Sequence, residues 1–324
     1  MIFLKLSILS MHFNKAGKSL FVFFFYFILI NTEMQGQNFT TKKSADGIEI
    51  FENGKKILFY QVSPKSVNGK YERAGYVHPL YDLDEKILTE DMPADHPYHR
   101  GIFWAWHQLI WNNKNIGDGW ISENISYKPV MADVKEKTNS LVLQSEMIWN
   151  ARVDSNIVSI VREKTSITVF KSTAQYHIID FDIKLAALVD NLKIGGSDDA
   201  KGYGGFCLRL KLPKDISFVS GNKEVIPQET AVLAGPWMDI SGSFEGEPSP
   251  KTGVAVFGYP PGNDNNNPWI LRSVTSMQNI PYPGKKAIPL SKKGLTLKYR
   301  IVVHNSDIDT QDIEKLYQDY IKGK

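Results

Sequence analysis

Apolar and polar residues alternate through many stretches of this chain, and that two-residue period is typical of β-strands with one buried face. The clearest stretch is Tyr176–Leu188, in which every second residue from His177 to Leu185 is predicted to point to the same face of a sheet. Asn53-Gly54 lies between two shorter stretches and predicts a β-hairpin turn. The other predicted strands are Ile48–Phe51, Lys56–Gln61, Asn139–Trp149, Val158–Phe170, Gly205–Leu212, Gly253–Tyr259 and Leu295–His304.

One helix is predicted near the end of the chain, from Asp307 to about Lys322. Asp309 or Thr310 is placed to cap its first turn, and its apolar face consists of Ile313, Leu316, Tyr317 and Tyr320. Strands separated by turns and closed by one helix predict a mostly β protein, a large antiparallel β-sandwich with a C-terminal helix. By analogy, a supersandwich of the galactose-mutarotase type has this order of elements.

The first 36 residues have the parts of a secretory signal peptide. Three lysines precede an apolar run from Leu20 to Ile30, polar residues follow, and cleavage is expected near Gly36. We therefore expect a signal peptide over residues 1–36, a single β-sandwich domain over residues 37–324, and a periplasmic or secreted location. No later stretch is long and apolar enough for a membrane helix, so the mature protein is expected to be soluble.

Charge and cysteine content narrow the function classes. The chain has 38 Lys and Arg against 35 Asp and Glu, with no basic stripe, so a nucleic-acid partner is not predicted. Cys207 is the only cysteine, which excludes an intrachain disulfide and thiolate-rich zinc sites. Its apolar neighbours predict a core residue. Nothing in the composition indicates an oligomeric state.

The segment Asp95–His107 (DHPYHRGIFWAWH) concentrates residues that can carry chemistry. A strand that starts at Gly101 would place His107 on one face, with Trp104 and Trp106 on the other. Histidine exchanges protons near neutral pH, arginine binds carboxylates through a planar fork, and tryptophan can stack on a sugar. The predicted catalytic residues here are His96, His99, Arg100 and His107, and the predicted substrate-binding residues are Trp104 and Trp106. Each also has a structural interpretation, as a core or hydrogen-bonded residue.

Further candidates lie outside this segment. Tyr203, in the glycine-rich stretch Gly202–Arg209, is a predicted proton donor and catalytic residue. The predicted substrate-binding residues outside the segment are His78, Arg209, Trp269 and Arg272. The glycine-rich stretch lacks the lysine and following helix of a phosphate-binding loop, so nucleotide binding is not predicted.

A metal site is the main alternative for the histidines. No cofactor is predicted, but His96, His99 and His107 are side chains that a divalent ion such as zinc could use, and Asp95 could join them. Their spacing matches neither His-Glu-x-x-His nor His-x-x-Glu-His.

The chain resembles a family of exported bacterial proteins known as DUF6807, formerly labelled "methane oxygenase". The resemblance runs from about Tyr76 to Tyr320 and is most specific at Asp95-His-Pro-Tyr-His-Arg-Gly101. The weaker blocks are Gly202–Arg209, Pro268–Arg272 and Tyr299–His304. Members often carry a histidine in the loop before the Pro-Trp step, whereas residues 263–267 here read NDNNN.

This resemblance implies work on sugars derived from polysaccharides, because such proteins typically accompany carbohydrate-degradation systems. The older label conflicts with the sequence, since a membrane methane oxygenase needs several apolar spans and this chain has none after its predicted signal peptide.

Together these observations predict a carbohydrate-active enzyme, a carbon–oxygen lyase that acts on a uronic-acid residue of an oligosaccharide by β-elimination. Arg100 or Arg209 would neutralise the carboxylate, His99 or His96 would take the proton, and His107 or Tyr203 would protonate the leaving oxygen. Loss of water would make the protein a dehydratase, and loss of a sugar alcohol would make it a polysaccharide lyase. Ulvan is one uronate polymer that fits.

Two other functions stay open at the sequence level. A glycoside hydrolase would need a pair of carboxylates, for which Asp95, Glu123, Asp239 and Glu245 are candidates. A protein that binds oligosaccharides without turning them over would need only the aromatic and polar side chains.

Overall fold

The computed structural model describes residues 38–246, 250–259 and 267–323. Contacts divide the chain into two units, residues 1–36 and 37–324, and every described residue belongs to the second. The predicted signal peptide, and most of the 263–267 loop, lie outside the described residues. No helix within the described ranges is both long and apolar enough to cross a membrane.

The described chain is mostly β-structure, built on two large antiparallel sheets, as the alternating pattern predicts. In order across the seven-stranded sheet lie β1 (Phe39–Lys43), β2 (Gly47–Glu52), β3 (Lys55–Gln61), β6 (Tyr76–Leu80), β7 (Ile102–Trp106), β15 (Gly204–Leu208) and β22 (Gln278–Pro281). In order across the nine-stranded sheet lie β10 (Ile125–Lys137), β11 (Ser140–Val153), β12 (Asn156–Phe170), β13 (Tyr176–Ala187), β24 (Leu295–Asn305), β20 (Thr252–Tyr259), β19 (Trp237–Gly242), β16 (Ser217–Ser220) and β17 (Lys223–Glu224).

Smaller sheets extend this frame. One is formed by β23 (Ile288–Pro289), β14 (Leu192–Gly195), β8 (Gln108–Trp111) and β9 (Lys114–Gly117). Two pairs complete the set, β18 (Val232–Ala234) with β21 (Asn267–Trp269), and β4 (Lys65–Val67) with β5 (Lys70–Arg73).

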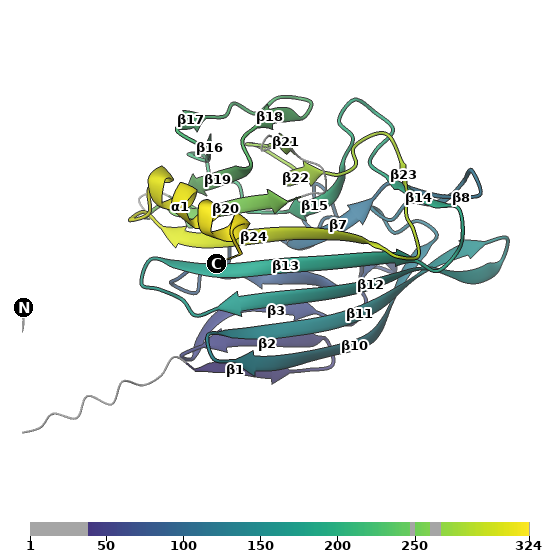
Figure 1. The fold of residues 1–324 in the computed structure, drawn as a ribbon, viewed down its shortest axis with the longest axis horizontal. Coiled ribbons are helices and arrows are strands. Elements are labelled where there is room, and N and C mark those ends of the chain that lie inside the picture. The colour runs from purple at the N-terminus through teal and green to yellow at the C-terminus, as the bar shows by residue number, and fades with distance from the viewer. Residues whose placement is uncertain (1–37, 247–249, 260–266, 324) are drawn as a thin grey trace, which may run out of the picture. The chain divides into compact units, whose positions relative to one another are not determined.

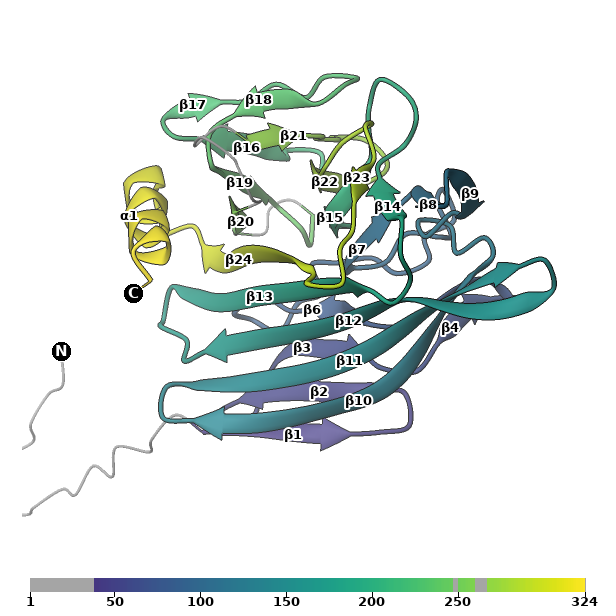
Figure 2. The ribbon, with the colours of Figure 1, turned by 45° about the vertical axis from the view of Figure 1, so that its right-hand side comes forward.

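The two large sheets pack face to face, with β1–β3 behind β10–β12 in both views (Figures 1 and 2). Their facing side chains form one core; Trp104 of β7 and Phe181 of β13, for example, lie 6.5 Å apart between ring centres. In β13 the alternate residues from His177 to Leu185 are buried, as predicted. The predicted β-sandwich is therefore confirmed.

The predicted β2–β3 turn is present, whereas one predicted strand ends earlier than expected. Asn53 and Gly54 both have positive φ, 53° and 81°, as the predicted hairpin between β2 and β3 requires. The strand predicted over Gly205–Leu212 is shorter and ends at Leu208, because beyond it the chain bonds to a different segment, where Leu210 forms an isolated bridge with Thr89.

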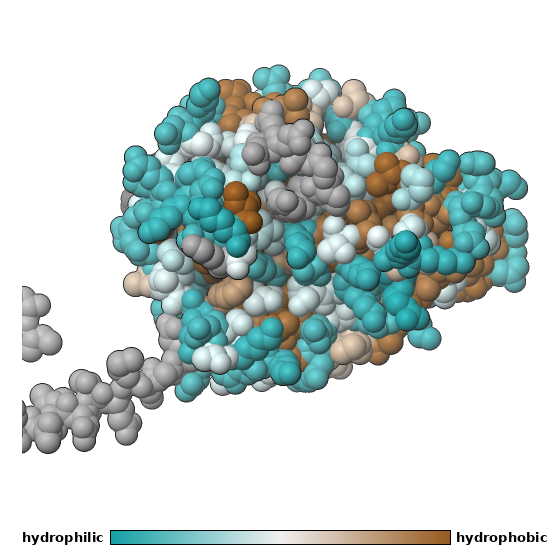
Figure 3. Space-filling view, in the orientation of Figure 1, coloured by the Kyte–Doolittle hydropathy of each residue, from teal (hydrophilic) through white to brown (hydrophobic). Residues whose placement is uncertain are grey.

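The predicted helix is present as α1 (Thr310–Ile321), capped by Asp309 through a capping box with Asp312. Ile313 and Tyr317 are buried against Trp237, Phe257 and Val302 on the outer face of the nine-stranded sheet. The molecular surface seen from this side mixes hydrophilic residues with separate hydrophobic patches (Figure 3).

Candidate active site

The His-rich segment passes from a tight turn into β7. Backbone hydrogen bonds from His96 to Pro93 and from His99 to His96 fold the turn, and Met92 N–H donates to His99 O. The strand then starts beside Gly101, where a Cβ atom would collide with the carbonyl oxygen of Val77. Glycine is therefore required for β7 to approach β6 this closely.

All five residues of β7 are buried, because both faces of the strand are covered. Trp104 and Trp106 point into the core between the sheets, whereas Phe103 and Ala105 point to the opposite face and pack with Trp120. His107, on the same side as Phe103, follows directly. The predicted alternation is confirmed, and the face that carries Phe103 carries the candidate site.

Trp120 is the centre of this outer face and is 3% exposed. Besides Phe103 of β7, whose ring centre is 5.6 Å away, three other rings surround it, those of His107 at 4.8 Å, Tyr203 at 5.5 Å and His99 at 6.2 Å. His96 and Tyr98 extend the group through contacts with His99. We call these residues the outer aromatic cluster: His96, Tyr98, His99, His107, Trp120 and Tyr203.

His107 is paired with Asp118 at the edge of the cluster. Its Nδ1 lies 2.8 Å from Asp118 Oδ2, and the two side chains are 24% and 21% exposed. Asp118 is fixed in turn, since its Oδ1 accepts hydrogen bonds from the backbone N–H groups of Trp120 and Ile121. No hydrogen bond joins Nε2 of His107 to any described residue. An ionised Asp118 fixes the proton on Nδ1 and leaves Nε2 as a proton acceptor.

Buried groups below the cluster hold the turn that carries Trp120. Arg73 of β5 donates through its guanidinium to the backbone oxygen of Gly119 and lies 3.0 Å from the hydroxyl of Tyr127. The Tyr127 hydroxyl also donates to Gly119 O at 2.7 Å. The position of Trp120 therefore depends on an arginine from a distant strand.

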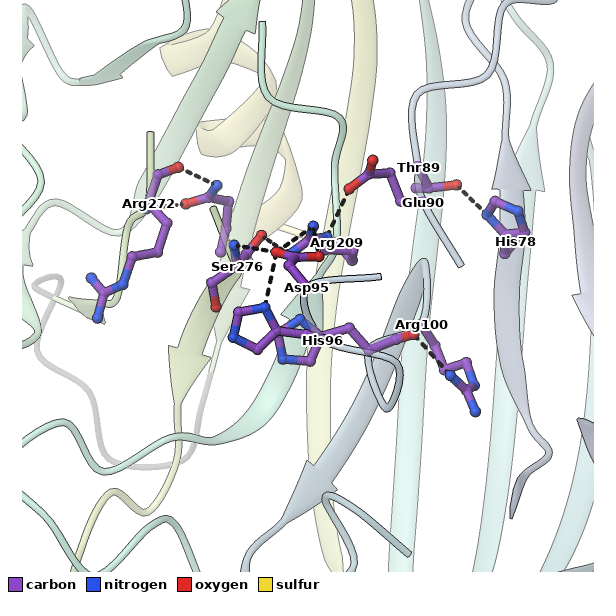
Figure 4. Close-up of polar contacts among 11 residues, drawn as sticks. His78, Thr89, Glu90, Asp95, His96, Arg100, Arg209, Arg272 and Ser276 are labelled. Atoms are coloured by element: carbon purple, nitrogen blue, oxygen red, sulfur yellow. Dashed lines mark hydrogen bonds and ion pairs between the residues drawn. The ribbon is translucent and has the colours of Figure 1, made fainter. Parts of the chain in front are cut away.

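A second aspartate–histidine pair lies in the turn before β7 (Figure 4). His96 Nδ1 is 2.9 Å from Asp95 Oδ2, and Arg209 donates to both Asp95 oxygens at 2.8 and 3.0 Å. Burial opposes ionisation of Asp95, but hydrogen bonds from His96 and Arg209 outweigh it and hold the pKa of this carboxyl well below its usual range. Asp95 is therefore an anion that orients His96.

Arg209 is fully engaged in this network. Its Nε donates to Glu90 at 2.8 Å, and a terminal nitrogen donates to the backbone oxygen of Ser276 at 2.6 Å. The side chain is only 5% exposed. The arginine predicted to bind substrate therefore holds Asp95 and two loops together.

His99 lies beneath His96, with the rings stacked at 4.5 Å and 5° apart in plane. Burial, reinforced by the neighbouring His96, lowers the pKa of His99 to about 2. Its buried Nδ1 has no hydrogen-bond partner among the described residues. His99 is therefore a neutral imidazole at physiological pH and a weak base.

Tyr203 and Arg272 form the other side of the cluster. The Arg272 guanidinium lies 5.6 Å from the centre of the Tyr203 ring and donates to the backbone oxygens of Gln228, Glu229 and Leu271. Burial raises the pKa of Tyr203, although the charge of Arg272 works against this. Tyr203 therefore keeps its proton at neutral pH and is available as a donor.

Four residues predicted for the site lie elsewhere. Trp104, Trp106 and Trp269 are at most 2% exposed in the core, so they offer no surface on which a sugar can stack. Arg100 is wholly buried and points away from His96, toward the backbone oxygens of Pro97, His99 and Tyr71 (Figure 4). The terminal nitrogens of Arg100 therefore tie its own turn to β5.

His78 is also set apart from the cluster around Asp95 (Figure 4). Its Nδ1 lies 3.0 Å from the hydroxyl of Thr89, and burial lowers its pKa to about 4. Its hydrogen-bond partner is thus Thr89, outside the outer aromatic cluster, and no hydrogen bond or ring contact joins it to the cluster in the described part of the chain.

The arrangement of acidic and imidazole groups bears on the two alternatives, a metal site and a glycoside hydrolase. Among the described residues, no group of three or more His, Cys, Asp or Glu side chains is placed to hold a metal ion. His96 and His99 stack face to face rather than converge on one point. Three of the four carboxylates considered for hydrolysis have other partners, Asp95 with Arg209, Asp239 with His304 and Glu245 with Lys211.

Sequence reasoning missed Asp118, Trp120 and Arg73. The signal for the first two is local, because Gly117-Asp-Gly-Trp120 ends a short strand in a glycine turn that aims an acid and an aromatic ring back at β7. Arg73 gives no such signal, since its partner Gly119 lies 46 residues away along the chain.

Comparison with known proteins identifies a family but no relative of known function. A family model described as "Family of unknown function (DUF6807)" matches residues 48–318. A search of curated proteins found no match. A solved structure described as a "putative mutarotase" from Salmonella typhimurium covers 82% of this chain and 94% of its own, at 10% identity and a TM-score of 0.34. The sequence predicted a fold of that type, but a likeness at this TM-score carries no argument about function.

Proposed function

The chain belongs to this family, whose function is not known, and we propose that it is a carbohydrate-active enzyme that acts on uronic-acid-containing oligosaccharides by β-elimination. One observation carries the proposal. His107 has its Nδ1 bound to Asp118 and its Nε2 facing no described partner, beside the Trp120 ring that also contacts Tyr203. Such a pair is suited to remove a proton from carbon and return one to oxygen.

His107 is the proposed base. The proton on the carbon α to the carboxylate moves to Nε2, and Asp118 stabilises the imidazolium that forms. The electron pair of the broken C–H bond forms the C=C bond, and the bond to the β-oxygen breaks. His96, oriented by Asp95 in the same way, is the second candidate for a proton transfer.

Tyr203 is the proposed acid, because burial keeps its phenol protonated. Its proton goes to the departing oxygen, which leaves as water in a dehydratase or as a sugar alcohol in a lyase. The tyrosinate then regains a proton from solvent, and the imidazolium loses one, so the enzyme returns to its starting state.

The group that neutralises the substrate carboxylate differs from the one expected from sequence. Arg100 is buried and Arg209 is saturated by Glu90, Asp95 and Ser276. Arg272 is the proposed group because it is partly exposed beside Tyr203, although its terminal nitrogens already donate to backbone oxygens and would have to share these donors with the carboxylate. Neutralising the carboxylate stabilises the carbanion-like transition state. Export to the periplasm or exterior, where uronate polymers such as ulvan are degraded, is part of the same proposal.

The test is a panel of uronate oligosaccharides incubated with the protein, with and without a chelator, and read by mass spectrometry and by absorbance of the new C=C bond. Loss of one water or cleavage with new absorbance is expected. His107→Gln should abolish it, whereas His78→Gln, a half-buried histidine outside the cluster, should not. Cleavage by addition of water, or no reaction with any member, would remove the elimination mechanism.

A further inference from the structure

A cavity with both charged and aromatic lining residues lies on the opposite outer face of the sandwich, where the last turn of α1 meets β12, β13 and β24. Its volume is about 500 Å³, which falls in the range of small-molecule sites, roughly 300–1,000 Å³. We call it the α1 cavity, and the residues that matter in its lining are Phe170, Asp180, Asp182, Lys298, Arg300 and Tyr320. The packed core separates it from the outer aromatic cluster, so the two are distinct sites.

Arg300 is held rigidly in this cavity. Its Nε and a terminal nitrogen lie 2.6 and 2.9 Å from the two oxygens of Asp180. The guanidinium sits 4.7 Å from the ring centre of Tyr320 and 5.5 Å from that of Phe170. Although it lies on the outer side of β24, Arg300 is only 7% exposed. An exposed surface ion pair is normally solvated and not flanked by rings. This pair, with a buried guanidinium beside Tyr320 and Phe170, therefore resembles a binding site more than a surface ion pair.

Tyr320 adds an unsatisfied group. Its hydroxyl is buried and has no hydrogen-bond partner among the described residues. Burial also raises its pKa, so the hydroxyl keeps its proton. Because buried polar atoms almost always have a partner, this hydroxyl is a hydrogen-bonding group that the described residues leave unused.

The charges of the cavity cancel. Asp180 pairs with Arg300, and Asp182 pairs with Lys298 at 3.4 Å. A charged ligand would have to break one of these pairs, whereas a hydroxyl can donate to a carboxylate and accept from a cation at the same time. The flanking aromatic rings offer apolar faces to C–H groups.

We propose that the α1 cavity binds an uncharged sugar residue of an oligosaccharide, at a site separate from the outer aromatic cluster. The α1 cavity would hold a polysaccharide fragment through one of its neutral sugar residues, while the outer aromatic cluster on the other face carries out the elimination. This binding does not depend on the elimination reaction.

Isothermal titration calorimetry with neutral tetrasaccharides of xylose, glucose, mannose and galactose, and with glucuronate-bearing counterparts, tests the assignment on the whole protein. At least one neutral tetrasaccharide should bind. Tyr320→Phe should weaken its binding about 3–10-fold, the value of one hydrogen bond, and leave the melting temperature unchanged. Asp182→Asn should weaken binding by a similar factor, whereas Asp133→Asn, at an exposed pair with Lys43 outside the cavity, should not.

His107→Gln separates the two proposals, because it should abolish elimination and leave neutral binding intact. The α1 cavity assignment is overturned if no neutral tetrasaccharide binds, if only the glucuronate-bearing ones do, or if Tyr320→Phe and Asp182→Asn both bind like the unmodified protein.

Discussion

Two of the three aspartate–histidine pairs among the described residues, His107 with Asp118 and His304 with Asp239, have the same composition and different surroundings. In the open pair, His107 and Asp118 are 24% and 21% exposed, and only Nδ1 of the histidine is bound to a described residue. In the closed pair, His304 and Asp239 are 4% and 9% exposed. Both ring nitrogens of His304 have partners, Nε2 with Asp239 at 3.0 Å and Nδ1 with the backbone oxygen of Asn305 at 2.8 Å.

The difference shows that pairing alone does not mark a reactive histidine. With an acceptor at each nitrogen, His304 is suited to be a fixed cation, and although burial lowers its pKa, the bonds to Asp239 and Asn305 outweigh this and raise it. Gly253 lies against this ring, where a Cβ atom would collide with Nε2. What the second nitrogen faces, protein or open space, separates a structural pair from a candidate catalytic one.

Asp118→Asn should give the largest effect on the open pair. The amide cannot stabilise an imidazolium or fix the tautomer as a carboxylate does, so turnover should fall about 10²–10⁴-fold. The fold should persist, because Asn keeps an oxygen for the backbone N–H groups of Trp120 and Ile121. Steady-state kinetics on the oligosaccharide found by the panel measure the loss, and unchanged turnover would show that this pair is not the base.

Asp239→Asn makes the same chemical change in the closed pair. We expect turnover per folded molecule to stay the same, and the free energy of unfolding to fall by about 1.5–3 kcal/mol, the value of a hydrogen bond to a charged group. Denaturant titration provides the measurement. A large loss of turnover with unchanged unfolding free energy would show that the closed pair also takes part in catalysis, and would contradict its structural role.

Sequence patterns were sufficient for most of the frame. Strands with one buried face, such as β13, and the capped amphipathic α1 repeat their pattern over many residues, so local physics determines them. β10 was missed because its second half is largely exposed and shows no buried stripe. Strand β7 was found, but periodicity could not tell which face is the core, since both are buried.

For the candidate site, the sequence located the segment that carries the histidines but not the way each side chain points. Composition located His96, His99 and His107, because they lie in one short segment. Composition could not show which way a side chain points. Arg100 points away from the histidines, toward two backbone carbonyls of its own turn and the carbonyl of Tyr71 on β5. Asp118 and Trp120 come from a different element, and their contact with His107 depends on tertiary packing that no local pattern contains.

The pH dependence of stability gives a finer comparison of the closed pair with its Asp239→Asn variant. A histidine whose pKa is raised by folding stabilises the protein fully below its unfolded value, about 6.5, and this contribution is lost as pH rises through the raised folded value. The difference in unfolding free energy between the unmodified protein and Asp239→Asn should therefore be largest below about pH 6.5 and shrink at higher pH. A difference that grows with pH would contradict a raised pKa for His304.

Substitution of His99 should have only a small effect on turnover, because His99 lies in the same cluster as His107 but is buried and has no carboxylate partner in the described part of the chain. Because burial lowers the pKa of His99 to about 2, it stays neutral through the physiological range and cannot serve as an efficient base. His99→Phe keeps a ring to stack on His96 and removes a buried nitrogen that has no partner among the described residues. We expect turnover to change less than about tenfold, and the free energy of unfolding to stay the same or rise. If His99→Phe instead matches the loss in Asp118→Asn, the proton is taken at the stacked histidines, and His107 is only their neighbour.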